Sequence, residues 1–325
     1  MTDNSINFSG SDFHELTGEP GFLSDKPYLQ FNPVELPPEM DDFELGFVIG
    51  NGSTGTVYRS VQRKEFAIKV VKWIPDYLRE TAKREYDTAR LFADCEKTVH
   101  AIAYYEHNFS SFILQEIGEP ILDYFFKNTC SMRMILQALL DVSEALSSIH
   151  AKGYTHFDVK PSNILMIKGK ARLGDFSHCL RCVPGQEYER SMGTKGYKAP
   201  EASPREKHSG REDMYSLGIT MYALLTAGVL PFDEKSETNP SEKEKLQISS
   251  LFIHPELLSI IRKAAAIDPA ERYQTFESFS EDVRSFMKKN DGFLDEKAPA
   301  YFAGELRKQT IPPFSFAEGT IGDLS

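Results

Sequence analysis

The sequence predicts an α+β protein in which a small, β-rich part precedes a larger, mostly helical part. Short runs rich in β-branched and aromatic residues fill positions 43–71, a composition typical of strands. After Gly118 the apolar residues recur at intervals of three and four, which is typical of one buried helix face. The clearest series is Ile135, Leu139, Val142, Leu146 and Ile149.

The composition is that of an ordinary globular protein. The chain has 325 residues, of which 41% are hydrophobic and 26% charged, enough for two lobes with a core. Its net charge is -11, and no basic block or stripe is present, which disfavours nucleic acid or an acidic membrane as partner. The first residues lack the features of a signal peptide, and no apolar run is long enough to span a bilayer. We therefore expect a location in the cytoplasm, with the nucleus as an alternative.

Four stretches differ in composition. Residues 1–42 contain five prolines and show no helical or strand periodicity, as expected of a flexible or wrapped extension. Residues 43–118 form the expected β-rich lobe, and residues 119–288 form the expected helical lobe. The tail, 289–325, is again acidic and contains Gly and Pro, so we expect it to be disordered or docked through its aromatic residues.

Within the smaller lobe we expect an antiparallel sheet and one helix. Residues 43–49, 56–61 and 65–71 have the composition of three strands. Residues 75–92 predict a helix with charges on one face, and residues 111–116 return to an extended apolar run.

Within the larger lobe the helix that contains Ile149 should end near Gly153. Residues 217–230 are nearly all apolar, but this stretch is too short to span a membrane and better fits a buried core helix. Two further helices are expected, around 257–266 and 276–289.

The residues suited to catalysis are grouped in two short stretches of the larger lobe. The first reads His-Phe-Asp-Val-Lys-Pro-Ser-Asn over 156–163, and Asp175 follows twelve residues after Asn163. These stretches supply two carboxylates, a lysine and an amide, which suit a metal-bound triphosphate beside a hydroxyl nucleophile. Asp158 alone would fit a turn carboxylate, but the joint pattern favours phosphoryl transfer.

A glycine-rich segment lies between the first two predicted strands. Gly50, Gly52 and Gly55 have no Cβ atoms, so the backbone amides of this segment can approach phosphate oxygens closely. A plain glycine-rich hairpin would explain the same spacing, and a dinucleotide site would need a helix after it.

Lys69 strengthens the phosphate interpretation, because it is a single charge near the end of an apolar strand. On its own such a lysine would equally be solvated at the strand end. Glu85 on the following helix can neutralise it, with Glu80 as the competing candidate. Glu85 is preferred because Ala89 and Phe92 continue its face of the helix, although a helix glutamate is more often solvated.

These motifs, in this order, resemble the eukaryotic-type protein kinases of the Ser/Thr branch, from about Phe43 to about Met287. The resemblance implies the bilobal protein-kinase fold, ATP and Mg²⁺ as cofactors, and transfer of the γ-phosphate to a hydroxyl of a protein substrate. It implies the following roles: catalytic base for Asp158, γ-phosphate contact for Lys160, phosphate anchoring for Lys69 with Glu85, and Mg²⁺ ligation for Asn163 and Asp175. Oxygen ligands are those that Mg²⁺ prefers.

The resemblance also implies a slot for adenine. Its apolar lining is expected from Ile49, Val57, Ala67 and Leu165, all of which would fit a plain core equally well. Backbone groups from Glu116 to Gly118 are the expected hydrogen-bonding partners. Gln115 should guard the rear of the slot, and Asp123 is a candidate for the ribose.

Three further matches concern the substrate platform and its support. Residues 193–201 resemble the end of an activation segment, on which a peptide substrate lies. Asp213 matches the buried aspartate that ties down the catalytic loop. Arg272 matches the arginine that pairs with Glu201, and breaking such a buried pair typically costs about 3–5 kcal/mol.

Two positions depart from the family pattern. Phe157 stands where an arginine usually pairs with a phosphorylated activation loop, so we hypothesise that activity does not need phosphorylation at Ser191 or Thr194. Ser177 replaces the glycine after Asp175 and Phe176, which should restrict the flip of the aspartate without removing it.

Alternative functions remain open at this point. A pseudokinase scaffold is the second interpretation, because a fold does not establish an activity, although all five residues of the expected catalytic set are present. Tyrosine or dual specificity is a lesser alternative, suggested by Phe157 and residues 174–178, which faintly resemble the cell-cycle inhibitory kinases. A small-molecule kinase of related fold is disfavoured by the platform at 193–201.

Four cysteines are too few for a disulfide scaffold in a chain of this length. Cys179 and Cys182, preceded by His178, have a spacing that could bind zinc or form a redox disulfide. No second pair of ligands lies nearby in the sequence, so we expect reduced thiols.

Overall fold

The computed structural model describes residues 34–298, except 53, 74–76, 129, 184, 188–190, 232–252 and 297. The chain divides into a unit of residues 1–35 and a unit of residues 36–325, and every element below belongs to the second. Most of the predicted N-terminal extension and of the predicted C-terminal tail, including its aromatic residues, lies outside the described residues.

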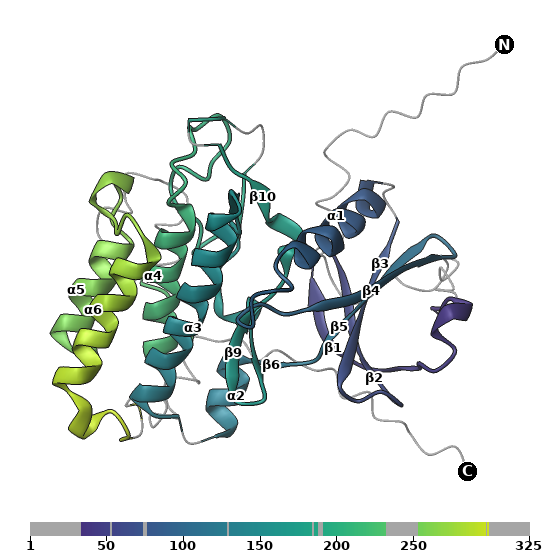
Figure 1. The fold of residues 1–325 in the computed structure, drawn as a ribbon, viewed down its shortest axis with the longest axis horizontal. Coiled ribbons are helices and arrows are strands. Elements are labelled where there is room, and N and C mark those ends of the chain that lie inside the picture. Colours follow the sequence, from purple (N-terminus) through teal and green to yellow (C-terminus); the bar gives the residue numbers. More distant parts are fainter. Residues whose placement is uncertain are drawn as a thin grey trace, which may run out of the picture. The chain divides into compact units, whose positions relative to one another are not determined.

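A five-stranded antiparallel sheet forms the N-terminal lobe (Figure 1). Its strands, in spatial order, are β1 (Leu45–Gly52), β2 (Gly55–Ser60), β3 (Phe66–Lys72), β5 (Ser110–Glu116) and β4 (Ala101–His107). Four of these strands were predicted, and β4 was not. Of its residues only Ala101 is buried, so β4 lacks the apolar alternation that marks a strand in the sequence.

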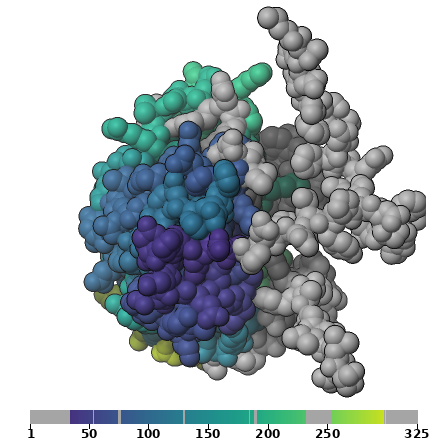
Figure 2. Space-filling model, turned by 90° about the vertical axis from the view of Figure 1, so that its right-hand side faces the viewer, coloured from purple at the N-terminus to yellow at the C-terminus, as the bar shows by residue number. Residues whose placement is uncertain are grey.

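Helix α1 (Tyr77–Leu91) packs against this sheet and confirms the helix expected at 75–92. Ala82, Glu85 and Ala89 are among its buried residues, and Phe92 directly after it is fully buried. The inward face of the helix is therefore the one that the sequence predicted. Viewed from the sheet end of the molecule, the purple and blue surface of this lobe faces the reader (Figure 2).

The C-terminal lobe is mostly helical, which confirms the bilobal α+β fold. Its helices are α2 (Ile121–Lys127), α3 (Met132–Ala151), α4 (Glu212–Leu225), α5 (Pro255–Ala264) and α6 (Phe276–Lys289). All fourteen residues of α4 are buried, as expected of a core helix. It ends at Leu225 rather than 230, because Ala227 and Gly228 adopt left-handed φ values of 56° and 98°.

Short strands surround the loops that carry the predicted catalytic residues. One sheet contains β6 (Glu119–Pro120), β8 (Ile164–Ile167) and β9 (Lys170–Leu173), and a second pairs β7 (Tyr154–Thr155) with β10 (Leu180–Arg181). Two 3₁₀ turns, η2 (Pro161–Asn163) and η3 (Phe176–His178), follow Asp158 and Asp175, respectively. Backbone hydrogen bonds of Leu173 to Val99 and Lys97, at 2.9 and 2.8 Å, join β9 to the N-terminal lobe. No helix among the described residues is long and apolar enough to cross a membrane.

Candidate active site

Lys69 on β3 and Glu85 on α1 form a buried ion pair. The Nζ atom of Lys69 lies 2.7 and 2.8 Å from the two carboxylate oxygens of Glu85, and both side chains are 6% exposed. Burial favours the neutral amine, but the negative charges of Asp175 and Glu85 outweigh it and raise the pKa of Lys69. The competing candidate, Glu80, is exposed. The structure thus contains the contact between Lys69 and Glu85 that the sequence predicted.

Asp175 faces the same lysine from the other lobe. Its Oδ1 atom lies 3.4 Å from Lys69 Nζ and accepts the backbone N–H of Ser177 at the same distance. Asp175 has a left-handed φ of 59°, whereas Ser177 lies in the 3₁₀ turn η3, so this arrangement does not require glycine at position 177. Phe176 stacks on Phe92 with 5.4 Å between ring centroids, which holds the turn against α1.

The loop before Asp158 is anchored by Asp213 at the start of α4. The two oxygens of Asp213 accept the backbone N–H groups of His156 and Phe157, each at 2.7 Å. His150 Nε2 lies 2.8 Å from the same carboxylate. Burial alone would raise the pKa of Asp213, but the hydrogen bonds and the nearby histidines lower it overall. Asp213 therefore holds the loop as a buried carboxylate, as the family resemblance implied.

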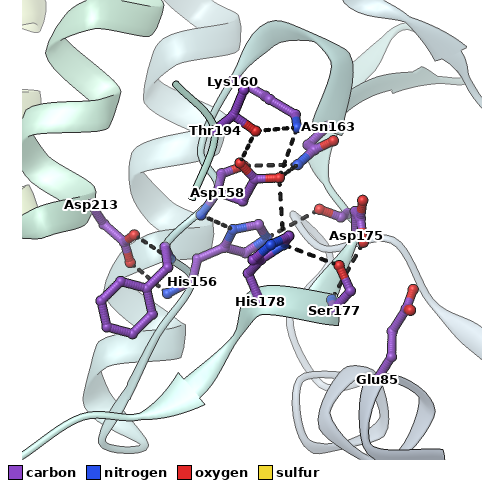
Figure 3. Close-up of polar contacts among 12 residues, drawn as sticks. Glu85, His156, Asp158, Lys160, Asn163, Asp175, Ser177, His178, Thr194 and Asp213 are labelled. Carbon is purple, nitrogen blue, oxygen red and sulfur yellow. Dashed lines mark hydrogen bonds and ion pairs between the residues drawn. The ribbon is translucent and has the colours of Figure 1, made fainter. Parts of the chain in front are cut away.

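Lys160, Asn163 and Thr194 approach the carboxylate of Asp158 to within 3.0 Å (Figure 3). Lys160 Nζ lies 2.8 Å from Oδ2, the Asn163 amide donates to Oδ2 at 3.0 Å, and the Thr194 hydroxyl donates to Oδ1 at 2.6 Å. Burial opposes ionisation of Asp158, but Lys160 and the hydroxyl of Thr194 outweigh it, so its pKa is lowered. A carboxylate with these partners can accept a hydrogen bond from a substrate hydroxyl.

Thr194 and His178 are two site residues whose contacts the sequence did not reveal. Thr194 bridges Asp158 and Lys160, because its hydroxyl also accepts a hydrogen bond from Lys160 Nζ at 2.6 Å. His178 Nδ1 lies 3.8 Å from Asp158 Oδ2. Burial lowers the pKa of His178, although the charges of Asp158 and Asp175 oppose this, so the imidazole is neutral near pH 7. The position of Thr194 after Gly193 was a usable signal, whereas the sequence marked His178 only as a neighbour of Cys179 and not as a partner of Asp158.

Asn163 and Asp175 provide oxygen atoms that fit a hard cation. The Asn163 amide nitrogen donates to the backbone oxygen of Asp158 at 2.8 Å and to its carboxylate, which directs the amide oxygen away from these acceptors. The negative charge of Asp175 persists, since Lys69 and the hydrogen bonds from Ser177 outweigh burial and lower its pKa. One amide oxygen and one carboxylate suit Mg²⁺ with waters and phosphate oxygens completing its shell. Among the described residues no group of three or more His, Cys, Asp or Glu could hold a metal.

An open recess of about 670 Å³ lies beside the segment that joins the two lobes. Of the predicted adenine-site residues, its lining includes Ile49, Glu116 and Gly118, and the ribose candidate Asp123 also contributes. Phe47 and Met166 provide further apolar surface. A recess of this size can hold a nucleotide-sized ligand. Lys69, Asp158 and Asp175 are not among its lining residues, so the recess and the ion pair are separate features of the site.

Val57, Ala67 and Leu165 lie outside the lining of this recess. Ala67 is buried and pairs with Gln115 across β3 and β5, and Leu165 packs closely on Gly118. A Cβ atom added to Gly118 would lie 2.7 Å from Leu165 Cβ, so only glycine permits this approach. Gln115 lines a small cavity with Glu85 and Asp175, which places it behind the ion pair.

The predicted glycine-rich segment forms the β1–β2 hairpin. Gly50 pairs with Val57, and Gly52 pairs with Gly55 at the tip. Gly50 and Gly52 belong to β1, and Gly55 begins β2. The hairpin therefore precedes the strand that carries Lys69, in the arrangement expected from the sequence.

Phe157 is buried in a small apolar cluster. The cluster comprises Phe157, Met192, Ala199, Ala202, Tyr215, Ile219 and Ala265. Phe157 has a left-handed φ of 64°, and its ring makes an edge contact with His208 at 5.1 Å. Its backbone oxygen leaves no room for a Cβ at Gly193, which would lie 2.3 Å away. The aromatic ring thus joins the catalytic loop, α4 and residues 192–202.

The expected substrate platform is fixed to the helical lobe. Arg272 donates from Nη1 and Nη2 to the Glu201 carboxylate at 2.5 and 2.9 Å and is 2% exposed. Ser216 on α4 donates to the backbone oxygen of Tyr197 at 2.9 Å. These contacts match the structural roles that were expected for Glu201 and Arg272.

Cys179 and Cys182 are free thiols, as are the two other cysteines. They flank the two residues of β10, and burial raises the pKa of Cys182 to about 11. A thiol with this pKa is a poor nucleophile and a poor metal ligand at neutral pH.

Comparisons with known proteins identify the family of this chain. The protein kinase domain family matches residues 43–290. The serine/threonine-protein kinase PEPKR2 of Arabidopsis thaliana is 33% identical over 199 residues, which are 59% of this chain and 41% of that protein. The phosphorylase b kinase gamma catalytic chain, liver/testis isoform, of Homo sapiens is 33% identical over 210 residues, 57% and 50% of the two chains.

One relative that matches a larger part of this chain is described as inactive. The inactive serine/threonine-protein kinase PLK5 of Mus musculus is 26% identical over 296 residues, 83% of this chain and 47% of that protein. The chain spans about half the length of these curated relatives.

Proposed function

Since the chain belongs to the protein kinase domain family, we propose that it is an active protein Ser/Thr kinase that transfers the γ-phosphate of Mg-ATP to a protein hydroxyl. The observation that carries this proposal is the convergence of two groups of residues. Lys69 and Glu85 meet Asp175 from the N-terminal lobe, and Asp158 contacts Lys160 and Asn163 in the C-terminal lobe.

The proposed reaction begins with a substrate hydroxyl that donates a hydrogen bond to the carboxylate of Asp158. The Lys160 ammonium, 2.8 Å from this carboxylate, lies where it can stabilise negative charge on the transferring group. Lys69, held by Glu85, binds phosphate oxygens of the nucleotide. Mg²⁺, held by Asn163 and Asp175, would neutralise charge on the phosphates. The bond between the γ-phosphorus and the β–γ bridging oxygen breaks and ADP leaves, while the phosphoryl group bonds to the acceptor oxygen and the acceptor proton passes to Asp158.

Thr194 supports Ser/Thr rather than tyrosine specificity. Its hydroxyl contacts both Asp158 and Lys160, so this part of the platform lies close to the proposed base. A serine or threonine acceptor has a short side chain, so the substrate backbone must approach Thr194 and Asp158 closely. Tyrosine or dual specificity is the lesser alternative, and phosphoamino-acid analysis of the product distinguishes the two.

We further propose that activity is independent of activation-loop phosphorylation. Phe157 packs with Met192, Ala199 and Ala202, so the segment is attached to the catalytic loop by apolar contacts. Phosphatase-treated enzyme should keep its turnover, and Ser191→Ala should behave in the same way. A loss of turnover on phosphatase treatment that maps to Ser191 or Thr194 would contradict this proposal.

A pseudokinase is the second candidate, favoured by the similarity to the inactive PLK5. The deciding experiment measures transfer of labelled γ-phosphate to a degenerate peptide library with Mg-ATP. Wild-type protein should label peptides, and Asp158→Ala and Asp175→Ala should not, whereas the exposed control Asp42→Ala should. Transfer that survives both site variants, or nucleotide binding without any transfer, would overturn the proposed function.

We also propose a location in the cytoplasm or nucleus and, on the basis of the net charge of -11, no nucleic-acid or membrane partner. Fluorescence microscopy of the tagged full chain tests the location. Partition of the tagged protein into the membrane fraction would contradict it.

A further inference from the structure

The platform next to Asp158 is basic, although the protein as a whole is acidic. The platform, residues 193–201, contains two lysines, Lys195 and Lys198, and one glutamate, whereas the chain has a net charge of -11. The glutamate, Glu201, is paired with the buried Arg272. The local charge is therefore opposite in sign to that of the molecule and lies where a substrate must approach.

Lys198 is held at a defined distance from the reacting groups. The backbone oxygen of Thr194 accepts the N–H of Lys198 at 3.0 Å and that of Tyr197 at 3.1 Å. This i to i+4 hydrogen bond places Lys198 about one helical turn, roughly 5–6 Å, from Thr194. The Thr194 hydroxyl contacts Asp158 at 2.6 Å (Figure 3). Lys198 therefore lies close to the substrate residues that flank an acceptor bound at Asp158.

The ammonium of Lys198 is directed along the platform by a neutral partner. Its Nζ atom donates to the hydroxyl of Ser191 at 2.6 Å, and Ser191 is exposed. In the part of the chain that the structure describes, no carboxylate forms an ion pair with Lys198. The charge of Lys198 is thus not neutralised by the described residues of the platform. The exposed Lys195, directly after Thr194, adds positive charge on the same segment.

An extended peptide advances about 3.3 Å per residue, so the residues on either side of the acceptor pass within reach of the long lysine side chain. We infer that this platform selects protein substrates with an Asp or Glu within two residues of the acceptor, and that Lys198 makes the selecting contact. The inference rests on the proposed kinase activity and specifies its substrate class.

The test uses the full chain and a set of serine peptides with Glu, Gln or Lys at each position within two residues of the acceptor. At one position or more, the Glu peptide should have a kcat/KM about fivefold above the Gln peptide, as expected for a partly exposed ion pair. The ratio should decrease at 0.5 M NaCl, because salt screens exposed charges. Lys198→Glu should reverse the preference at that position towards the Lys peptide.

Two variants separate a specific contact from a general charge effect. Lys170→Glu makes the same charge change at an exposed site on β9 and should leave the Glu to Gln ratio unchanged. Lys198→Gln should bring the ratio of kcat/KM for the Glu and Gln peptides to about one, and its melting temperature shows whether the variant is folded. If Lys198→Glu has no activity, the ratio in Lys198→Gln alone tests the inference.

The possible failures are distinguishable. Equal turnover of Glu, Gln and Lys peptides at every position, or a preference that survives in Lys198→Gln, would overturn the inference and leave the kinase activity standing. Absence of transfer to every peptide and protein by the wild type would overturn the proposed function, and the inference with it.

Discussion

The hydroxyl of Thr194 donates to the carboxylate of Asp158 at 2.6 Å and accepts from Lys160 at the same distance. A side chain of the platform thus completes the group of donors around the proposed base. The geometry of that carboxylate therefore depends on a segment more than thirty residues further along the chain. Several expected outcomes depend on contacts of this kind.

Thr194→Val should lower kcat about 10- to 100-fold. It removes a hydrogen bond to a charged group, a loss typically of about 1.5–3 kcal/mol, and should raise the pKa of Asp158, which Thr194 helps to lower. The measurement is the pH dependence of kcat. Thr194→Ser keeps the hydroxyl and should retain most activity; an equal loss in both variants would show that the hydroxyl is not responsible.

Glu85→Ala should destabilise the protein and weaken nucleotide binding. It leaves the buried ammonium of Lys69 with only Asp175 at 3.4 Å, and breaking a buried ion pair typically costs about 3–5 kcal/mol. Urea unfolding and titration with a non-hydrolysable ATP analogue measure the two effects. Glu80→Ala, at an exposed position on the same helix, should change neither the unfolding free energy nor the nucleotide affinity. Wild-type values of both in Glu85→Ala would refute the role of Glu85 as the partner of Lys69.

Asp213→Asn should lower the free energy of unfolding at pH 7 by about 2–4 kcal/mol, because it removes a charged acceptor from two buried N–H groups. The pKa of Asp213 is lowered in the folded state relative to its ordinary value of 3.8. Its stabilisation is therefore complete above that value and is lost as pH falls through the folded pKa.

The difference in unfolding free energy between wild type and Asp213→Asn should accordingly stay constant near neutral pH and narrow as the pH falls below 3.8. Urea titrations at several pH values measure it. Asp42→Asn, at an exposed position, provides the baseline. A difference that stays constant below that pH as well would mean that the charge of Asp213 makes no contribution.

Gly118→Ala should raise the KM for ATP. The added Cβ would lie 2.7 Å from Leu165 Cβ and 2.8 Å from Ile167 Cγ1, so the connecting segment must shift where it lines the recess. Steady-state kinetics with varied ATP measure the change. Gly292→Ala, where a Cβ meets nothing within 4 Å, is the matched control, and an unchanged KM in Gly118→Ala would place the nucleotide elsewhere.

The sequence predicted the helices and strands that have a clear local pattern of apolar residues. The repeat through Ile149 and the apolar run of α4 each specify a helix. Strand β4 was missed because only one of its residues is buried and it lacks apolar alternation, so that its pairing with β5 alone defines it as a strand. Partners of strand and helix residues depend on tertiary packing, which local propensity does not encode.

For the candidate site, the spacing of motifs in the sequence identified the residues with an expected chemical role. It did not identify the neighbouring side chains that set their positions and pKa values. Lys69 and Glu85 could be paired because strand and helix periodicity set their faces. The contact of His178 with Asp158 arises from the 3₁₀ turn after Asp175, a local conformation that no spacing rule specifies. Val57, Ala67 and Leu165 likewise do not line the recess, because which face of a residue is covered depends on tertiary packing.

The burial of Phe157 with Met192 and Ala199 has a consequence for how the enzyme responds to its surroundings. Where an arginine and a phosphate hold an activation segment, added salt weakens the attraction. Apolar packing is insensitive to such screening, but it weakens on cooling. We therefore expect the catalytic loop and platform of this protein to stay ordered in high salt and to loosen first in the cold.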